Sequence, residues 1–512
     1  MPEVSSQHRP LVVVANREPY LHVRRTDGTI ATVQTTGGVS VALDALMRER
    51  GGTWIAHGAG NADAEMVDAN DRVPVPPDAP EYTLRRVWLS AEEEKKYYNG
   101  FANEGLWPLS HIVHVRPRFR SEDWAAYRRV NARFAEAAAA ELTDPRTLVF
   151  IQDYHLAIVA DELRMLEPSV KTALFWHIPW PHPDRLRICP WRREILQGLL
   201  ANDLLAFQLE TDRRNFLLCV GDNFDADIDD GRIARDGHAT DVIAAPIGVD
   251  FERIQSVASD PTLDHDVVRI LREQRLDDPD VEVIGVGVDR LDYTKGILER
   301  LDAIDLLLTR RPDLRRRLAF VQVGVPSRSK IRSYAAIESR IDERVAEINA
   351  RHGRSATDGP IRYRKSALRL RQLIALYRLA DFCVVSSLHD GMNLVAKEFV
   401  AAREDLGGVL VLSEMTGASR ELTDALIINP YHTEGFALAI ERAIYMPLQE
   451  RTRRMRALRG VVAGRDVFHW ASDILDRLSN LNAERAASAW PLAVPRPTLL
   501  KRVASSASNV RG

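Results

Sequence analysis

The 512-residue chain is long enough for two or three domains. Its 45% apolar and 28% charged content is ordinary for a globular protein, and its formal net charge of -3 lacks the basic excess of a nucleic-acid-binding surface. No apolar run predicts a membrane span, and the start of the chain lacks the apolar core of a secretory signal. With cysteines only in apolar settings, we expect a cytoplasmic protein with reduced thiols and neither nucleic-acid nor membrane partners.

Short apolar runs alternate with helix-length segments along the whole chain. In the first half they predict strands at 10–17, 147–153, 171–179, 203–208 and 241–249. In the second half they predict strands at 281–290, 318–324, 380–387, 407–414 and 425–430. Continuous apolar strands separated by helices are typical of parallel α/β sheets covered on both faces. Because this is more strands than a single open sheet usually contains, we expect two doubly wound domains.

The boundary between these domains is predicted at the Pro/Gly turn "PIGVD" (246–250). We expect an N-terminal domain over 1–247 and a C-terminal domain over 248–481. The remaining residues, 482–512, are rich in Pro, Ser and small residues, which favours a mobile tail.

Ligands of open α/β sheets bind at the carboxyl ends of the strands, so residues that follow the predicted strands are the candidate site. In the first half these are Arg17, Asp153 and His177. A carboxylate there can hold sugar hydroxyls, whereas a histidine between aromatic and proline residues fits a hydrogen-bonded core position equally well. Gly37 and Gly38 precede a predicted helix, an arrangement that offers N–H groups to an anion.

Two aromatic residues of the first half lie in a segment with little periodicity, 94–111. They are Tyr98 and Trp107. Aromatic rings over a cavity are common in carbohydrate sites, but packing in the core is the default role of such side chains.

In the second half, Arg290 and Lys295 flank a turn directly after a predicted strand. Two cations at one strand end suit a diphosphate, because Arg offers a planar fork and Lys a point charge. The alternative is a surface pair of Arg290 with Asp289 or Asp292. Arg328 places a third cation after the next strand.

The string "HDGMN" lies between a predicted strand and the helical "LVAKEFVAA". Asn393 suits a helix N-cap, and Gly391 permits close approach of the backbone. A carboxylate at Glu398, about one turn into the helix, can accept both hydrogens of a vicinal diol such as a ribose. The alternative is an ordinary capped helix with a surface glutamate.

These cations, carboxylates and glycines all fall at predicted strand ends. Their coincidence predicts a cleft between two α/β domains that holds two phosphorylated, hydroxyl-rich ligands. The chain has no "GxxxxGK[ST]", "CxxC" or "HExxH" string. We therefore expect no metal ion and no cofactor.

The ordered strings "ANR", "TGG", "YYNGFANEGLWP", "QDYHL", "HIPWP", "DRLDYTKG", "PSR" and "DGMNLVAKE" resemble those of the trehalose-6-phosphate synthase family. The resemblance runs from about Leu11 to about Leu478. It implies the glycosyltransferase B fold, in which two Rossmann-like domains face a central cleft. It also implies that the last helix, 466–481, crosses back to the first domain.

The resemblance further implies a role for each candidate residue. The acceptor, glucose 6-phosphate, would be bound by Arg17, Tyr98, Asp153 and Arg328. The donor, a nucleotide-glucose, would be bound by Gly37, Gly38, His177, Arg290, Lys295, Leu368, Asp390, Gly391, Met392, Asn393, Leu394, Val395, Ala396, Lys397 and Glu398. The residues implied in catalysis are Arg290, Lys295, Asp153 and His177. Trp107 and Ile178 match positions tied to selecting the α anomer.

The implied reaction is a retaining glucosyl transfer that makes α,α-trehalose 6-phosphate, with UDP-glucose as the favoured donor. Two alternatives stay open: a synthase that uses glycerol 3-phosphate to make glucosylglycerol phosphate, and a catalytically silent sugar-phosphate sensor. The chain departs from the family pattern in the insertion 18–34, at Leu368 and at His389, where the family often has an arginine. The nucleotide base and the oligomeric state, including a homo-oligomer, are left open.

Overall fold

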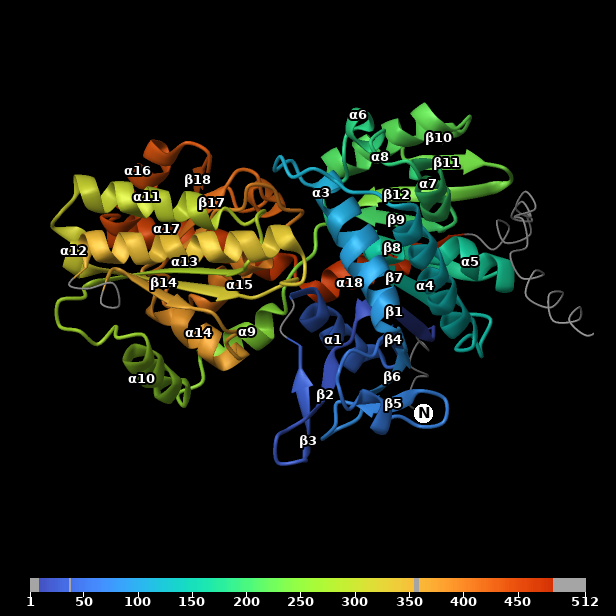
Figure 1. The fold of residues 1–512 in the computed structure, drawn as a ribbon, viewed down its shortest axis with the longest axis horizontal. Helices are drawn as coiled ribbons and strands as arrows, with labels where there is room; N and C mark the ends of the chain where they lie inside the picture. Colours follow the sequence, from blue (N-terminus) through green and yellow to red (C-terminus); the bar gives the residue numbers. More distant parts are fainter. Residues whose placement is uncertain (1–8, 36–37, 354–358, 482–512) are drawn as a thin grey trace, which may run out of the picture.

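The computed structural model describes residues 9–35, 38–353 and 359–481 (Figure 1). Two separate parallel sheets, each flanked by helices, form two lobes, which confirms the predicted α/β class. The chain leaves the first sheet at Ala244 and enters the first helix of the second lobe at Phe251. The predicted tail, 482–512, lies outside the described residues.

The first sheet has the strand order β10-β11-β12-β9-β8-β7-β1-β4-β6-β5. It is parallel from β12 to β6 and antiparallel at both edges. Its strands are β1 (Leu11–Arg17), β4 (Thr53–His57), β5 (Arg72–Val75), β6 (Tyr82–Val87), β7 (Leu148–Gln152), β8 (Lys171–Trp176), β9 (Leu204–Phe207), β10 (Asp227–Asp229), β11 (Arg232–Arg235) and β12 (His238–Ala244).

The second sheet is parallel throughout, with the order β15-β14-β13-β16-β17-β18. Its strands are β13 (Val283–Arg290), β14 (Leu318–Val325), β15 (Ile361–Arg364), β16 (Phe382–Val385), β17 (Val409–Ser413) and β18 (Leu426–Ile428). A two-stranded hairpin, β2 (Tyr20–Arg24) with β3 (Ile30–Gln34), stands apart from both sheets.

The helices of the two lobes follow the same division. The first lobe contains α1 (Gly38–Arg50), η1 (Asp63–Glu65), α2 (Ala91–Glu93), η2 (Glu94–Leu106), α3 (Trp107–Ser110), α4 (Ser121–Ala139), η3 (Tyr154–Leu156), α5 (Val159–Leu166), α6 (Pro183–Leu186), α7 (Arg192–Leu200) and α8 (Glu210–Asn223). The second contains α9 (Phe251–Ala258), α10 (Leu263–Glu273), α11 (Ile297–Arg310), α12 (Leu314–Arg317), α13 (Arg332–His352), α14 (Leu370–Leu379), α15 (Leu394–Ala402), η4 (Gly417–Arg420), α16 (Thr433–Ile444) and α17 (Leu448–Gly464).

Every strand predicted from an apolar run is a strand in the structure, but the sequence analysis missed several others. Strands β4 and β6 lie inside the first sheet, yet their sequences, "TWIAH" and "YTLRRV", include polar residues at the ends or in alternation. Edge strand β15, "IRYR", is only partly buried, so it alternates apolar and basic residues. The weakly periodic segment 94–111 is not a loop, because η2 is a π-helix with α3 directly after it.

The last helix, α18 (Val467–Asn480), lies against β7, β8, β9 and α1 of the first lobe, as Figure 1 shows. Its Trp470 is 3% exposed, and the ring centroid lies 5.7 Å from that of Phe150 and 5.0 Å from that of Phe175. One buried apolar cluster runs from this face of the first sheet through α18 into α14 and α15. The helix therefore fastens the end of the second lobe to the first.

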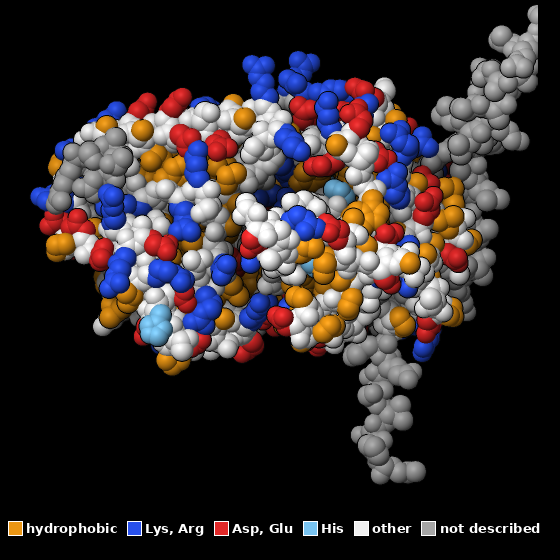
Figure 2. Space-filling model, turned by 60° about the horizontal axis from the view of Figure 1, so that its bottom comes forward, with side chains coloured by type: hydrophobic (Ala, Val, Ile, Leu, Met, Phe, Trp, Pro, Cys, Tyr) orange, Lys and Arg blue, Asp and Glu red, His pale blue; other side chains and the backbone are white. Residues whose placement is uncertain are grey.

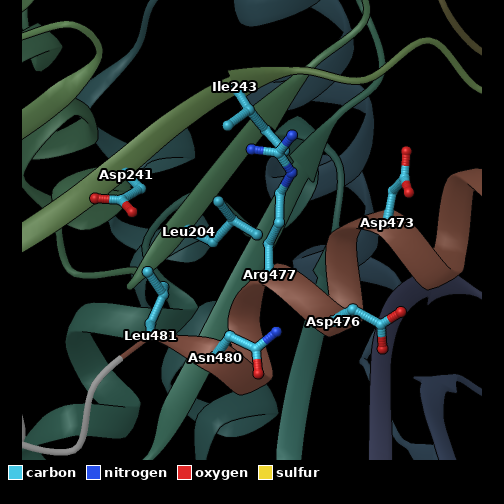
Figure 3. A pocket seen from close by; sticks show the side chains of 8 residues that line it. All are labelled: Leu204, Asp241, Ile243, Asp473, Asp476, Arg477, Asn480 and Leu481. Carbon is cyan, nitrogen blue, oxygen red and sulfur yellow. The ribbon is translucent and has the colours of Figure 1, made fainter.

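A cavity of about 340 Å³ lies beside α18, between this helix and strands β9 and β12 (Figure 3). Polar side chains of α18 line it, including Asp473, Asp476 and Arg477. None of the candidate site residues lines this cavity. The three cysteines are buried and unpaired, and no helix among the described residues is long and apolar enough to cross a membrane.

Candidate active site

The strand-end residues of the two lobes face one another across their boundary. Arg328 follows β14 of the second sheet, and its Nη2 donates to the hydroxyl of Tyr154, which follows β7 of the first sheet, at 3.1 Å. The guanidinium carbons of Arg328 and Arg290 lie 4.2 and 5.4 Å from the ring centroid of Trp107. Figure 2 shows a hollow between the two lobes with Lys and Arg side chains within it. The predicted juxtaposition of cations at strand ends is thus present.

One cation cluster of the cleft is centred on the hydroxyl of Tyr98. Nη2 of Arg17 donates to this hydroxyl at 3.1 Å, and the ring of Tyr98 stacks on that of His155 at 5.4 Å. Burial raises the pKa of Tyr98, but the charges of Arg17 and Arg328 outweigh it and bring the pKa to about 7. A phenol at this pKa reports a strongly positive potential, which suits a dianionic group such as a phosphate.

Arg328 is held in place by contacts on several sides. Its backbone has a positive φ of 53°, an uncommon conformation for a residue with a side chain. Its Nη1 donates to the Tyr334 hydroxyl at 2.6 Å and lies 3.5 Å from Asp292 Oδ2. The side chain is 3% exposed, and its Nε atom has no partner among the described residues. A bound anion could satisfy that donor.

Asp153 and His177 lie side by side at the ends of β7 and β8. The backbone N–H of His177 donates to Oδ1 of Asp153 at 3.2 Å, and Asp153 itself has a positive φ of 72°. Burial raises the pKa of Asp153 to about 6 and lowers that of His177 to about 3. His177 Nε2 lies 2.9 Å from Gln152 Oε1, whereas its buried Nδ1 has no partner among the described residues. The imidazole is therefore neutral, and only one of its two ring nitrogens has a hydrogen-bond partner among the described residues.

The second cation cluster lies at the end of β13. Lys295 Nζ donates to Oδ2 of Asp390 at 2.5 Å, and the same oxygen accepts from Ser387 and Asn393, each at 3.1 Å. Burial raises the pKa of Asp390, but Lys295 outweighs it and holds the pKa at about 2. The aspartate is therefore ionised at neutral pH, although its side chain and that of the lysine are largely buried.

The alternative of a surface pair between Arg290 and a neighbouring aspartate is not adopted. Asp289 pairs with Arg300 at 2.8 Å, and Asp292 lies near Arg328 instead. No carboxylate of the described part of the chain lies within ion-pair distance of Arg290. Among the described residues, its guanidinium lies over the neutral ring of Trp107 instead.

The "HDGMN" string begins α15 as predicted, with Asn393 as its N-cap. Asn393 Oδ1 accepts from the backbone N–H of Ala396 at 3.2 Å. The first N–H groups of α15, including those of Leu394 and Val395, have no intrahelical acceptor and can meet an anion. Met392 is buried, and its carbonyl accepts from Ala418 at 2.9 Å.

Two glycines bring the lobes into close contact. A Cβ at Gly391 would lie 2.2 Å from the carbonyl oxygen of His177 and 3.2 Å from Cα of Ile178. A Cβ at Gly38 would lie 2.7 Å from Cδ1 of Leu394. The predicted glycine loop therefore meets the "HDGMN" helix, although Gly37 lies outside the described residues.

The remaining donor candidates have different surroundings. Burial raises the pKa of Glu398 to about 7, an effect that the Tyr377 hydroxyl partly offsets. Leu368 is 7% exposed and belongs to the core. The side chain of Lys397 is 2% exposed and already bonds the Ile247 carbonyl and the Glu421 carboxylate, each at 2.7 Å. This lysine fixes α15 to the connection between the lobes, so its ammonium group is not available to a ligand.

Several residues around the cleft were missed by the sequence analysis. They are Asn103, Tyr154, His155 and Tyr334, together with His111, whose ring lies 5.9 Å from that of His389. The first three are adjacent in sequence to predicted residues or lie within the strings quoted above, which is the only signal that marks them. No group of three or more His, Cys, Asp or Glu in the described residues could hold a metal ion, and metal independence stays a prediction.

Comparison with known proteins agrees with this geometry. The family model of glycosyltransferase family 20 matches residues 9–480. A trehalose-6-phosphate synthase of Mycolicibacterium vanbaalenii is 40% identical over 488 residues, which cover 94% of this chain and 98% of that protein.

Solved structures match the fold of both lobes. An E. coli protein described as bound with UDP-2-fluoro glucose has a TM-score of 0.81 and 31% identity, over 92% of this chain and 99% of its own. An α,α-trehalose-phosphate synthase (UDP-forming) from Burkholderia xenovorans, solved with glucose 6-phosphate, has a TM-score of 0.81 and 30% identity over the same shares. These matches confirm the glycosyltransferase B fold with two Rossmann-like domains. Because the family model and a close relative each span more than nine tenths of its length, the chain belongs to glycosyltransferase family 20 and to the trehalose-6-phosphate synthases within it.

Proposed function

We propose that this glycosyltransferase moves glucose from UDP-glucose to glucose 6-phosphate with retention and so forms α,α-trehalose 6-phosphate. The observation that carries this proposal is the pair of cation clusters in one cleft. Arg17 and Arg328 around Tyr98 form one, and Arg290 and Lys295, at and just after the end of β13, form the other. Two anionic substrates with hydroxyl groups between them match this arrangement, and the relatives' names point to the same pair of substrates.

The acceptor phosphate is assigned to the Arg17–Tyr98–Arg328 cluster. A dianion between the two guanidinium groups replaces Tyr98 as their partner and raises the pKa of the phenol again. Asp153, whose pKa of about 6 leaves it mostly ionised at pH 7, accepts hydrogen bonds from the sugar hydroxyls. Trp107 covers the acceptor beside both arginines and, with Ile178, restricts the anomer that fits.

The donor is assigned to the opposite side of the cleft. Arg290 and Lys295 neutralise the diphosphate, and the N–H groups of Gly37, Gly38 and the start of α15 add hydrogen bonds. The donor glucose lies against Asp390, Asn393 and His177. Its nucleoside is held by Glu398, whose half-buried carboxylate accepts the ribose hydroxyls.

The chemistry proceeds on one face of the donor sugar. The leaving diphosphate oxygen takes the proton of the acceptor hydroxyl as the anomeric bond breaks, and that hydroxyl oxygen then bonds to the same face of the anomeric carbon. The protein contributes positioning and stabilisation of the departing charge. Arg290 and Lys295 supply that stabilisation, so the transfer needs no metal ion.

The experiment is product mass spectrometry of the purified protein with UDP-, GDP- or ADP-glucose, each with glucose 6-phosphate or glycerol 3-phosphate, in the presence of EDTA. A non-reducing hexose disaccharide phosphate made from UDP-glucose is the expected result. Glucosylglycerol phosphate would identify the alternative synthase, and no product with any pair would favour the catalytically silent sensor again.

Variants test the diphosphate assignment. Arg290→Ala and Lys295→Ala should each lower kcat/KM by roughly 100-fold or more, the usual loss when a group that stabilises transition-state charge is removed. Arg371→Ala is the matched control, because Arg371 forms an exposed ion pair with Asp260 outside the cleft. Activity equal to the parent in both cleft variants would refute the assignment.

A further inference from the structure

A chain of buried hydrogen bonds connects the two lobes behind the acceptor cluster. Tyr154 Oη lies 3.1 Å from Arg328 Nη2 and 2.8 Å from Asn103 Oδ1. Asn103 Nδ2 in turn donates to the backbone carbonyl of Tyr98 at 2.7 Å. Tyr154 and Asn103 are 0% and 1% exposed, so water does not compete for these bonds.

Each bond of this chain has a fixed direction. An arginine can only donate, so the Tyr154 oxygen accepts from Arg328. The single hydroxyl proton of Tyr154 is then given to the Asn103 oxygen, which leaves the amide nitrogen of Asn103 to donate to Tyr98. Each donor and acceptor of the chain therefore finds its partner only in this geometry. Neither Tyr154 nor Asn103 has to touch a substrate.

The π-helix η2 makes the last bond possible. Asn103 follows Tyr98 by five residues, which is the spacing of the π-helical hydrogen bond. In an α-helix, a residue five positions on would point roughly 140° away from Tyr98. The same helix places the preceding residue, Tyr97, so that its hydroxyl donates to Asn16 Oδ1 at 2.8 Å, beside Arg17. Tyr97 and Tyr98 of the π-helix thus hydrogen-bond with Asn16 and Arg17, the last two residues of β1.

We propose that Tyr154 and Asn103 are positioning residues for the acceptor phosphate. They set the distance between Arg328 of the second lobe and Tyr98 of the first, so that both groups reach one phosphate. This inference rests on the proposed function. It goes beyond that function by assigning phosphate selectivity to two side chains that do not contact the phosphate.

Tyr154→Phe is the main test, since it removes one hydroxyl and keeps the ring. Arg328 then loses an acceptor and Asn103 loses a donor. We expect the KM for glucose 6-phosphate to rise roughly 10-fold or more, as for loss of a hydrogen bond to a charged group, with the KM for UDP-glucose within two-fold of the parent. The preference in kcat/KM for glucose 6-phosphate over unphosphorylated glucose should fall by the same factor.

Asn103→Ala is a second, independent variant and should change the same two quantities in the same direction. Because both residues act through one chain, the double variant should be no worse than the more damaging single variant. Calorimetric titration of the UDP-bound protein with glucose 6-phosphate gives a readout that does not depend on turnover, and both variants should bind this ligand more weakly.

Tyr82→Phe is the matched control. The hydroxyl of Tyr82 is also buried and donates to Asp44 at 2.7 Å, but it lies outside the chain between Tyr98 and Arg328. A parent-like KM for glucose 6-phosphate in Tyr154→Phe, an equal rise in both KM values, or additive losses in the double variant would each overturn the positioning role. A parent that makes no product with any donor would instead overturn the proposed function.

Discussion

Replacing Asp390 with asparagine isolates the electrostatic contribution of one buried ion pair. The carboxylate accepts from Lys295 at 2.5 Å, and the two side chains are 14% and 11% exposed. Asparagine keeps the size and one oxygen of the side chain but removes its charge. The lysine is then left buried without a counter-ion, which is the costly half of such a change.

The pKa of Asp390 gives the size of the expected loss in the free energy of unfolding. Although burial raises this pKa, Lys295 holds it at about 2, compared with an ordinary 3.8. A difference of about two units corresponds to about 2–3 kcal/mol of interaction with the ionised form. Because the pKa is lowered in the folded protein, this stabilisation is complete above pH 3.8 and is lost as the pH falls towards 2.

Urea unfolding followed by tryptophan fluorescence measures this effect. At pH 7 we expect the midpoint of Asp390→Asn to fall by roughly 0.8 M for a slope of roughly 3 kcal/mol/M. The difference from the parent should shrink below pH 3.8. Asp260→Asn is the control, since the pKa of Asp260 is also about 2 but its pair with Arg371 is solvent-screened, so we expect little change. Equal midpoints for the parent and Asp390→Asn at pH 7 would refute the reasoning.

Three further predictions concern the contacts between the lobes. Gly391→Ala places a Cβ 2.2 Å from the His177 carbonyl, so the cleft cannot close; we expect kcat/KM to fall more than 100-fold with an unchanged circular dichroism spectrum. His389 Nδ1 accepts from the Ile112 N–H at 3.1 Å, and burial lowers the pKa of His389 to about 4. The stability from this neutral imidazole is complete above pH 6.5 and declines as the pH falls to 4, and the contact itself is lost as the pH falls through 4. His389→Gln should therefore flatten the acid limb of the pH–rate profile near pH 4. Trp470→Ala should lower the free energy of unfolding by about 3–5 kcal/mol in denaturant titrations, because it empties the interface between α18 and the first sheet.

The strand ends of the site could be predicted because they follow from local pattern and one topological rule. Continuous apolar runs identified β1, β13 and β14, and the carboxyl ends of parallel strands meet at one edge of a sheet. The sequence pattern therefore places Arg17, Arg290 and Arg328 at one cleft. The N-cap at Asn393 was predicted for a similarly local reason, the preference of asparagine for helix starts.

The π-helix could not be predicted in this way. Its hydrogen-bond period is longer than the 3.6 residues per turn that the apolar pattern is compared with, so "EKKYYNGFANEGL" looks irregular. The positioning role proposed for Asn103 and Tyr154 depends on this helix and on a contact between the lobes. Both are set by tertiary structure, and a single sequence contains no local signal for either.

The insertion 18–34 shows a second limit. It contains the hairpin β2–β3, which is fixed by Arg86, a fully buried arginine that bonds Glu18 at 2.8 Å and Asp63 at 2.9 Å. Buried charges of this kind cannot be inferred from composition, because the same residues are mostly exposed elsewhere. The hairpin matters for the site because it connects Arg17 directly to the glycine loop.

The charges of the cleft explain why the two lobes must come together for the site to exist. Asp292 and Tyr334 of its own lobe contact Nη1 of Arg328, whereas Nη2 donates to Tyr154 of the other lobe and the guanidinium lies over the Trp107 ring of that lobe. Two arginines around Tyr98 lower the pKa of a phenol that burial alone would raise. A phosphate dianion is a better partner for this cluster than a phenol, and it contacts both lobes at once. If the acceptor phosphate binds here as proposed, it supplies negative charge to a cluster of cations that both lobes contribute.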